Sequence, residues 1–338
     1  MTTRFILGID TSCDDTSAAV VDEQLRVRAV QTTSQTNLHA LFGGVIPELA
    51  ARNHIAWIFP VIDTALKKSG VAPADLSAVA VTNYPGLLGS LLVGVGAAKG
   101  LSIGLKKPLI AVNHLEAHIH SAFLDRDDRP TAPYLALVVS GGHTTLMEIG
   151  ESGPTVLAET MDDAAGEAYD KIAKIAKLPY PGGPAIDKIA QTGDPLRYDL
   201  PHLMRSGKYK DTLAFSFSGI KSAVKRILEE EGDTVALADL MACFQSRVVE
   251  LIERRLTAAW EQKPYTALVV AGGVAANSAV RRMAQIFTDK RGVPLYLPEL
   301  KYCQDNGAMV AAAAFPRLDR GDFSPLDFDV TATCRPQK

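Results

Sequence analysis

Two histidines that stand four residues apart are the side chains of this chain best suited to chemistry. They are His114 and His118, in the segment Asn-His-Leu-Glu-Ala-His at 113–118. Residues four apart lie on one face of a helix, and that spacing suits two ligands of a divalent metal ion. A pair of surface or core histidines would show the same spacing, and the chain has seven histidines. The spacing alone therefore leaves a metal site and a structural pair open.

A metal site needs at least one further ligand, and Asp305 is the candidate. It stands in Cys-Gln-Asp-Asn-Gly-Ala-Met at 303–309, just ahead of an alanine-rich segment that reads as a helix. A carboxylate at this place could bind a metal ion. It would also serve well as a helix N-cap. The sequence does not choose between the two roles.

A zinc peptidase is the obvious alternative for two helical histidines. In the His-Glu-x-x-His motif the glutamate follows the first histidine directly, about 100° around the helix, and reaches the metal-bound water. Glu116 comes two residues after His114, which places it about 200° around the helix. It therefore points to the opposite face, and a metal-dependent endopeptidase is disfavoured.

Three turns of small and polar residues each follow an apolar run, at 10–16, 140–144 and 272–277. Glycine allows a backbone to approach a phosphate closely, so that exposed N–H groups bind it. Any one of these turns could simply connect two elements tightly. None matches a P-loop or a full Gly-x-Gly-x-x-Gly dinucleotide motif. Taken together, the three turns favour a nucleotide-like ligand.

The elements that would position these residues follow one pattern twice. An apolar strand, a small polar turn and a second apolar strand occur at 5–21 and again at 134–149, which indicates a weak internal repeat. The pattern predicts an α/β protein of two similar lobes, at 1–132 and 133–338, with the ligand site where they meet. Further predicted elements are strands at 26–32, 78–82 and 267–271, helices at 47–69, 89–105, 161–177 and 235–262, and an extended tail after Phe315.

Composition is ordinary for a soluble globular protein. Hydrophobic residues make up 47% and charged residues 22% of the 338 residues, which is typical of globular proteins. No run approaches the roughly 18 to 20 uninterrupted apolar residues of a membrane span, and no signal-peptide core follows the first residues. The four cysteines, at 13, 243, 303 and 334, form no Cys-x-x-Cys pair and are read as reduced thiols. We therefore expect a cytoplasmic protein that makes no membrane contact.

The formal net charge of −3 argues against a nucleic-acid binder that acts alone, because such proteins normally carry a basic excess. Basic residues do cluster at 171–177, at 221–226 and at Arg281 and Arg282. On helices, such charges more often form a solvated face than a binding surface. We expect any binding of nucleic acid by this chain alone to be weak, and a partner subunit to complete the surface.

Eight motifs, spread in order from Gly8 to Met309, resemble those of the TsaD family, formerly called Gcp and once named O-sialoglycoprotein endopeptidase. The opening Gly-Ile-Asp-Thr-Ser-Cys-Asp-Asp-Thr resembles the family's GIETSCDET, and Asn-His-Leu-Glu-Ala-His resembles NHLEGH. Together the blocks cover nearly the whole chain and are far more specific than any single motif. They lie at 8–16, 42–54, 113–118, 139–144, 162–171, 180–184, 215–219 and 305–309.

The resemblance implies an actin/Hsp70/sugar-kinase-like (ASKHA) fold and a tRNA-modifying acyltransferase. The threonylcarbamoyl group would pass from threonylcarbamoyl-adenylate to the exocyclic amine of the adenosine 3′ of the anticodon, in tRNAs reading codons that begin with A, with release of AMP. A TsaB-like subunit of the same fold and a TsaE-like ATPase would be partners. A non-catalytic actin-like scaffold is the remaining alternative, although the full histidine and aspartate set is present.

The resemblance also implies roles for individual residues. One divalent metal ion per chain, iron or zinc, would be bound by His114, His118 and Asp305. An adenylate or ATP-type nucleotide would be bound by Val138, Val139, Ser140, Gly141, Gly142, Asp170, Gly183, Asp187 and Asn277.

This chain departs from the family pattern at a few positions. Asp10 and Asp15 replace the glutamates of the opening motif, each one methylene shorter. Ala117 replaces the glycine of NHLEGH, and Asn83–Leu87 replaces the commoner T-x-GPGL. None of these changes affects a proposed metal ligand. Asp10 and Asp15 are the candidate general bases, and the sequence gives little to separate them.

Overall fold

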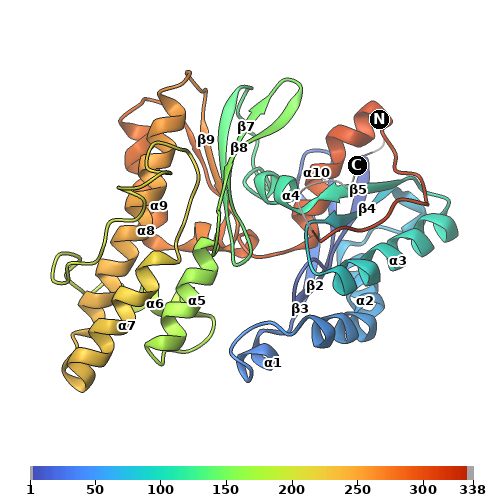
Figure 1. Ribbon diagram of the computed structural model, residues 1–338. Coiled ribbons are helices and arrows are strands. Elements are labelled where there is room, and N and C mark those ends of the chain that lie inside the picture. The colour runs from blue at the N-terminus through green and yellow to red at the C-terminus, as the bar shows by residue number, and fades with distance from the viewer. Residues whose placement is uncertain (1–2, 333–338) are drawn as a thin grey trace. The chain divides into compact units, whose positions relative to one another are not determined.

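The first sheet of the computed structural model, which describes residues 3–332, is built around the opening strand (Figure 1). Its five strands have the order β3-β2-β1-β4-β5. β1 (Phe5–Asp10) pairs antiparallel with β2 (Asp15–Asp22) and parallel with β4 (Leu76–Tyr84). β3 (Val27–Ser34) and β5 (Leu109–Asn113) form its edges. β1, β2 and β4 are almost wholly buried, as strands covered on both faces must be.

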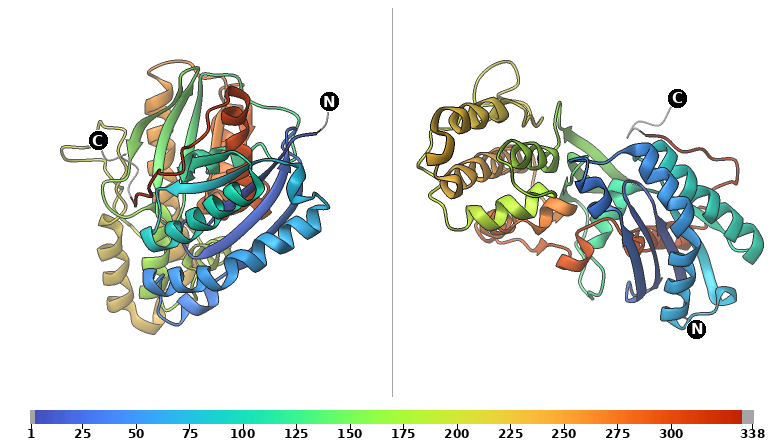
Figure 2. Two further views of the ribbon diagram at one scale, coloured as in Figure 1. Left: turned by 90° about the vertical axis from the view of Figure 1, so that its right-hand side faces the viewer. Right: turned by 90° about the horizontal axis from the view of Figure 1, so that it is seen from below.

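Two long helices cover one face of this sheet. α2 (Pro47–Ser69) and α3 (Leu88–Leu105) lie side by side along it (Figures 1 and 2). Leu7 and Ile9 of β1 share a core with residues of both helices. α2 begins with Pro47 at its first turn and ends at Gly70, whose φ of 68° is left-handed. Its predicted bounds are therefore confirmed, for the reasons that proline suits the first turn and glycine the C-terminus.

α3 is the one helix within residues 3–332 that is long and apolar enough, by length and composition alone, to cross a membrane. In the structure its residues Leu91, Val95 and Ala98 pack in the core beneath it. The core helix of a globular domain satisfies the same criteria, so α3 gives no support to a membrane assignment.

α10 (Gly307–Arg320) covers the opposite face of the sheet. Neighbouring residues of a strand point to opposite faces, so β1 can contact helices on both sides. Gly8 lies so close to α10 that a Cβ added to it would stand 2.1 Å from the carbonyl oxygen of Gly307. The amide of Gly307 donates to the Ser17 hydroxyl at 2.9 Å. This close approach requires glycine on both sides. It also places Asp10, two residues after Gly8, on the face toward α10.

The C-terminal segment belongs to the first unit, in contrast to the predicted lobe of 133–338. The chain divides into one unit of Met1–Arg129 with Pro298–Lys338 and a second of Pro130–Leu297. After α10, which runs five residues beyond Phe315, the tail passes along β5. The Ser324 amide donates to the Leu109 carbonyl at 2.8 Å, and its hydroxyl accepts from the Ala111 amide at 2.9 Å. Sequence periodicity could not reveal this return, because it depends on tertiary contacts.

The sheet of the second unit repeats the first. Its order is β10-β9-β6-β7-β8, and β6 (Tyr134–Val139) pairs antiparallel with β7 (Thr144–Gly150) and parallel with β9 (Leu268–Ala271). β8 (Gly153–Glu159) and β10 (Leu295–Tyr296) are its edges. Each strand thus corresponds in order and direction to one of the first sheet. The internal repeat predicted from the two opening hairpins is confirmed at the level of topology.

Five helices within the described part of the second unit share one core with its sheet, and this core includes Phe215, Phe217 and Phe244. The helices predicted at 161–177 and 235–262 begin later in the structure, at Ala165 and Leu237. The segment before α5 instead runs beside residue 215, and the Met161 amide donates to the Phe215 carbonyl at 2.9 Å. The helices are α5 (Ala165–Ile175), α6 (Gly182–Ala190), α7 (Gly219–Glu231), α8 (Leu237–Trp260) and α9 (Ser278–Asp289).

Cys13, Cys243 and Cys303 form no disulfide with one another, in agreement with the prediction of reduced thiols. Cys334 lies outside the described residues.

Candidate functional site

The two histidines lie on a short helix that begins where β5 ends. This helix, α4 (His114–Ser121), is capped by Asn113, whose side-chain oxygen accepts from the amides of Leu115 at 2.7 Å and Glu116 at 3.2 Å. Asparagine is among the best N-cap residues because its side chain satisfies amides that the first turn leaves free. The helix that the spacing argument for His114 and His118 assumed is therefore present. Only 5% of His114 and 0% of His118 is exposed to solvent.

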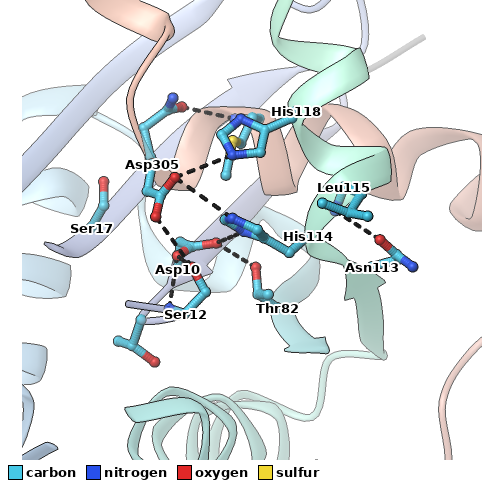
Figure 3. A network of polar contacts seen from close by, with 12 residues as sticks. Asp10, Ser12, Ser17, Thr82, Asn113, His114, Leu115, His118 and Asp305 are labelled. Atoms are coloured by element: carbon cyan, nitrogen blue, oxygen red, sulfur yellow. Dashed lines mark hydrogen bonds and ion pairs between the residues drawn. The ribbon is translucent and has the colours of Figure 1, made fainter. Parts of the chain in front are cut away.

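Asp305 lies against both histidines (Figure 3). Its Oδ1 is 3.2 Å from Nε2 of His118 and 3.6 Å from Nε2 of His114. Potential ligand atoms of the three residues all lie within 4.8 Å of one another. Neither ring nitrogen of His118 has a hydrogen-bond partner in residues 3–332, although both are buried. Two imidazoles and a carboxylate, gathered in this way, form a donor set that fits a divalent cation.

The competing N-cap role belongs to Asn306 rather than to Asp305. The side-chain oxygen of Asn306 accepts from the Met309 amide at 2.9 Å, and its nitrogen donates to the Gln304 carbonyl at 2.7 Å. Asn306 therefore begins α10 and holds the preceding loop. The Asp305 carboxylate is directed toward the histidines instead, and its Oδ2 lies 3.4 Å from the Ser12 hydroxyl oxygen.

Asp10 is fully buried and has partners at both oxygens (Figure 3). Its Oδ1 accepts from the amide and hydroxyl of Ser12, at 2.9 and 2.7 Å. Its Oδ2 accepts from the Thr82 hydroxyl at 2.5 Å and lies 3.3 Å from Nδ1 of His114. A carboxylate at Nδ1 keeps the proton on that nitrogen and turns Nε2 toward Asp305. Asp10 thus orients His114.

Electrostatics couple Asp10 and His114. Burial alone would lower the pKa of His114, but the charges of Asp305 and Asp10 outweigh it and raise that pKa to about 9. Burial likewise opposes ionisation of Asp10, yet the neighbouring His114 brings the pKa of Asp10 below its usual value. Asp10 therefore remains ionised beside the imidazole.

Asp15 has a different environment, although it begins the strand that follows the same turn. Its Oδ1 is buried and has no hydrogen-bond partner among the described residues. Burial raises the pKa of Asp15 to about 7; the Ser34 hydroxyl opposes the shift, and the charge of Asp305 adds to it. A carboxyl group with a pKa near neutrality and a free oxygen is suited to proton transfer.

The turn at 10–16 is held by His54 of α2, which sequence reasoning did not single out. The imidazole is fully buried; its Nδ1 lies 2.7 Å from the Thr16 hydroxyl and its Nε2 lies 2.9 Å from the Cys13 carbonyl. Ser12 and Thr82 were also missed as site residues. His54 could have been found because it ends the family-like motif at 42–54. Thr82 gave no such signal, since it reaches Asp10 from a neighbouring strand.

Glu116 is not part of the metal-type cluster that the described residues form. Burial raises the pKa of its carboxyl group, and the charge of Arg317 opposes that shift. Arg317 belongs to α10.

The remaining predicted residues all belong to the second unit. Val138 and Val139 end β6, and the Ser140 turn is closed by a bond from the Ser140 amide to the His143 carbonyl at 2.8 Å. A Cβ added to Gly141 or Gly142 would meet no heavy atom of the described residues within 4 Å. The backbone of this turn is therefore accessible to a ligand.

Asp170, Gly183 and Asp187 lie at α5 and α6. The Asp170 carboxylate accepts from the Gly182 amide at 2.7 Å, which fixes the start of α6. Asp187 accepts from the amide and the hydroxyl of Ser278 at 3.1 and 2.8 Å. Gly183 has open space where a side chain would be.

Asn277 has partners inside the protein for both ends of its amide. Its oxygen caps α9 by accepting from the Ala279 and Val280 amides, at 3.0 and 3.1 Å. Its nitrogen donates to the side-chain oxygen of Gln245 at 2.7 Å. Tyr169 completes this buried network, since its hydroxyl also donates to Gln245 at 3.3 Å. Asn277 therefore shapes the turn at 272–277.

The architecture is that of actin-like proteins. The component A of an (R)-2-hydroxyglutaryl-CoA dehydratase from Acidaminococcus fermentans is similar, with a TM-score of 0.55 at 14% identity, covering 94% of this chain and 99% of that one. HypF from T. kodakarensis gives a TM-score of 0.59 at 13% identity, over 94% of this chain and 48% of that one. These likenesses establish an ASKHA-type α/β fold that carries a metal-type cluster on its first unit.

Sequence comparison gives the family. A family model described as TsaD, tRNA N6-adenosine threonylcarbamoyltransferase, matches residues 26–312. Proteins with the name tRNA N6-adenosine threonylcarbamoyltransferase from Anaeromyxobacter dehalogenans (strain 2CP-C) and Moorella thermoacetica are 45% and 44% identical. The first match covers 98% of this chain and 99% of the relative; the second covers 96% and 95%. The chain belongs to the TsaD family, and it is a transferase of tRNA modification.

Proposed function

We propose that this chain transfers a threonylcarbamoyl group from threonylcarbamoyl-adenylate to the exocyclic N6 of the adenosine 3′ of the anticodon, in tRNAs reading codons that begin with A. The observation that carries the proposal is the match of about 45% identity, over almost the full length, to relatives named for this transfer. The alternative, a metal-dependent endopeptidase, is disfavoured because Glu116 does not belong to the cluster that His114, His118 and Asp305 form.

The reaction requires no protein nucleophile, because the donor is a mixed carboxylic–phosphoric anhydride. N6 attacks the carbamoyl carbon, the bond from that carbon to the phosphate oxygen breaks, and AMP leaves. N6 also gives up one proton. The protein must therefore align the two substrates, stabilise the charge that develops on the carbonyl oxygen, and accept a proton.

We assign His114, His118 and Asp305 as the ligands of one divalent metal ion, with iron and zinc both compatible with two imidazoles and a carboxylate. The buried ring nitrogens of His118, which form no hydrogen bond within the described residues, support this assignment. A bound ion would act as a Lewis acid that holds and polarises an oxygen of the acyl group. Asp10 would keep His114 in the orientation that metal binding requires.

We assign Asp15 as the general base for the N6 proton. Asp10 and Asp15 were equal candidates from the sequence, and their surroundings distinguish them. Both oxygens of Asp10 already have partners, and its pKa is lowered. Asp15 has a free buried oxygen and a pKa of about 7. At neutral pH a large fraction of Asp15 could therefore accept a proton.

We place the adenylate on the second unit. The open backbone at Gly141 and Gly142, after Val138, Val139 and Ser140, would bind its phosphate. Gly183 would allow the nucleoside to approach α6, with Asp170 and Asp187 fixing the adjacent backbone. Asn277 would act through the shape of its turn, because its own amide is already engaged.

We propose that a TsaB-like subunit binds the outer face of α2 and α3. Phe59 of α2 is 59% exposed and Leu92 of α3 is 52% exposed. Ile55, Leu88 and Ile103 are exposed on the same two adjacent helices. Exposed apolar side chains gathered in this way mark protein contacts. A TsaE-like ATPase and tRNA would complete the assembly, in the cytoplasm.

Incubation of the chain with its partner subunits, threonylcarbamoyl-adenylate and tRNA tests the proposal. Digestion of the tRNA to nucleosides should yield threonylcarbamoyladenosine, in equal amount to the AMP released. A control tRNA with guanosine in place of the target adenosine should stay unmodified. Release of AMP without modified nucleoside would refute the transfer.

A further inference from the structure

An irregular segment of the second unit carries exposed positive charges, and hydrogen bonds from α8 hold its backbone. Residues 199–214, here called the anchored loop, contain no helix or strand and run beside α8 (Figure 1). Between Asp199 and Asp211 the segment has no acidic residue, but it carries Arg205, Lys208 and Lys210. We propose that the anchored loop is a tRNA-binding element that contacts the phosphate backbone.

Arginines of α8 hold the loop by its backbone. The guanidinium of Arg255, which is buried, donates to the carbonyls of Ala214 and Lys210 at 2.9 Å each and to that of Tyr209 at 3.3 Å. Arg247 donates to the Leu200 carbonyl at 2.8 Å. Several bonds to main-chain oxygens fix the path of the chain without using its own side chains. These bonds therefore do not use the side chains of Lys208 and Lys210.

The charge around the loop is not balanced internally. One carboxylate, Glu250, faces His202 at 2.7 Å, Arg205 at 2.7 Å and Arg247 at 3.4 Å. Arg254 also lies near Glu250. Burial and the charge of Arg205 lower the pKa of Arg254, although the charge of Glu250 opposes that shift. Several cations therefore share one acidic partner. The excess of positive charge attracts an anion with several charges.

The outer part of the loop has the residues expected for RNA. Lys208, Tyr209 and Lys210 are consecutive and exposed, and Tyr209 is 43% exposed. The Lys208 ammonium lies 5.2 Å from the centre of the Tyr209 ring. Lysines neutralise phosphates, and an aromatic ring between them offers a surface for an unpaired base. A surface that binds another protein would more often present apolar residues beside such charges.

Basic residues on α5 and α7, in contrast, form ion pairs with carboxylates close to them in the sequence. Lys225 and Arg226 of α7 pair with Glu229 and Glu230, one turn further along, at 3.5 and 3.8 Å. Lys171 of α5 pairs with Asp163 and Glu167 at 2.5 and 2.9 Å. These pairs fit the predicted solvated faces. The anchored loop is the stronger candidate, because within residues 3–332 its two lysines form a single ion pair, between Lys210 and Asp211 at 3.9 Å.

The proposal rests on the proposed function, because that function makes tRNA the substrate. Its test compares Lys208→Ala/Lys210→Ala with Lys225→Ala/Arg226→Ala, which removes the same net charge from α7. Each chain is assembled with the partner subunits, and tRNA binding is measured by fluorescence anisotropy from 50 to 300 mM salt. The loop variant should lower the slope of log K against log salt by roughly 1 to 2 and weaken binding about fivefold or more. The α7 variant should match the wild type.

An unchanged slope and affinity in the loop variant would overturn the proposal. So would weakened assembly of the subunits with normal tRNA affinity, since that result would assign the loop to an acidic protein partner. Tyr209→Ala should weaken tRNA binding about threefold or more while Tyr209→Phe does not, because the ring alone is needed for stacking.

Steady-state transfer separates the loop from the reaction itself. The loop variant should raise the KM for tRNA while kcat and the KM for the adenylate stay at the wild-type values. A wild-type complex that binds tRNA through the loop but forms no modified nucleoside would refute the proposed function and leave the loop assignment standing. A fall in kcat with an unchanged KM for tRNA would overturn the loop assignment.

Discussion

Oδ2 of Asp10 lies 3.3 Å from Nδ1 of His114, while Nε2 of the same imidazole faces Asp305. The carboxylate is fully buried and is itself held by Ser12 and Thr82. The orientation of one candidate ligand thus depends on residues from β1 and β4. In other metalloproteins, loss of such a supporting carboxylate weakens metal binding or activity by roughly 10- to 100-fold.

Asp10→Asn should therefore lower metal affinity by about 10- to 100-fold, because an amide cannot support His114 as a carboxylate does. Equilibrium dialysis followed by elemental analysis measures this directly. Asp10→Glu, which restores the residue of the family motif, should bind more tightly than Asp10→Asn. Wild-type affinity in a folded Asp10→Asn protein would show that His114 needs no support.

The rate of transfer should depend on the protonation of Asp15. Because burial raises the pKa of Asp15 to about 7, the base form prevails above that pH and is lost below it. Single-turnover rates should rise through pH 7 and level off at higher pH. Asp15→Asn should lower the rate and remove this rise. A rise that persists in Asp15→Asn would assign the titration to another group.

The apolar face of α2 and α3 should determine assembly. Phe59→Asp or Leu92→Asp should weaken association with the actin-like subunit by at least about 30-fold, because each places a charge in the apolar centre of the contact. Ile286→Asp, at an exposed apolar residue of α9, is the matched control. Analytical ultracentrifugation provides the measurement. Equal assembly of all three variants would exclude this face.

The contact between β1 and α10 should tolerate no side chain. Gly8→Ala would place a Cβ 2.1 Å from the Gly307 carbonyl oxygen. We expect this substitution to lower the free energy of unfolding by about 3 kcal/mol. Gly100→Ala, on the exposed side of α3 with open space around it, should stabilise the chain by about 0.5 to 1 kcal/mol. Thermal melts of both variants test the difference. A Gly8→Ala protein as stable as the wild type would contradict this packing.

The sequence predicted the parts of the site that depend on local structure. Helical spacing placed His114 and His118 on one side of α4, and the apolar runs located β1, β6 and α2. The sequence could not decide whether Asp305 is a metal ligand or a helix N-cap, because a carboxylate just before a helix can serve in either role. That choice depended on Asn306, which takes the cap.

Long-range contacts were beyond the reach of periodicity. Thr82 and Asp10 are 72 positions apart and meet only because β1 and β4 are neighbours in the sheet. The return of the C-terminal segment to the first unit has the same cause, since α10 is required to cover the second face of that sheet. The environments of Asp10 and Asp15 likewise follow from tertiary burial, which residue identity does not indicate.

A single-turnover measurement of acyl transfer tests whether the metal-type site supports the reaction. Donor labelled in its threonyl carbon is mixed in a single turnover with tRNA and the assembled complex, carrying either the wild-type chain or His118→Ala. The wild type should label N6 of adenosine and release one AMP for each label. The variant should bind tRNA normally and transfer at least about 100-fold more slowly, because the ion and its polarising charge are lost. Equal labelling by the two complexes would contradict the account.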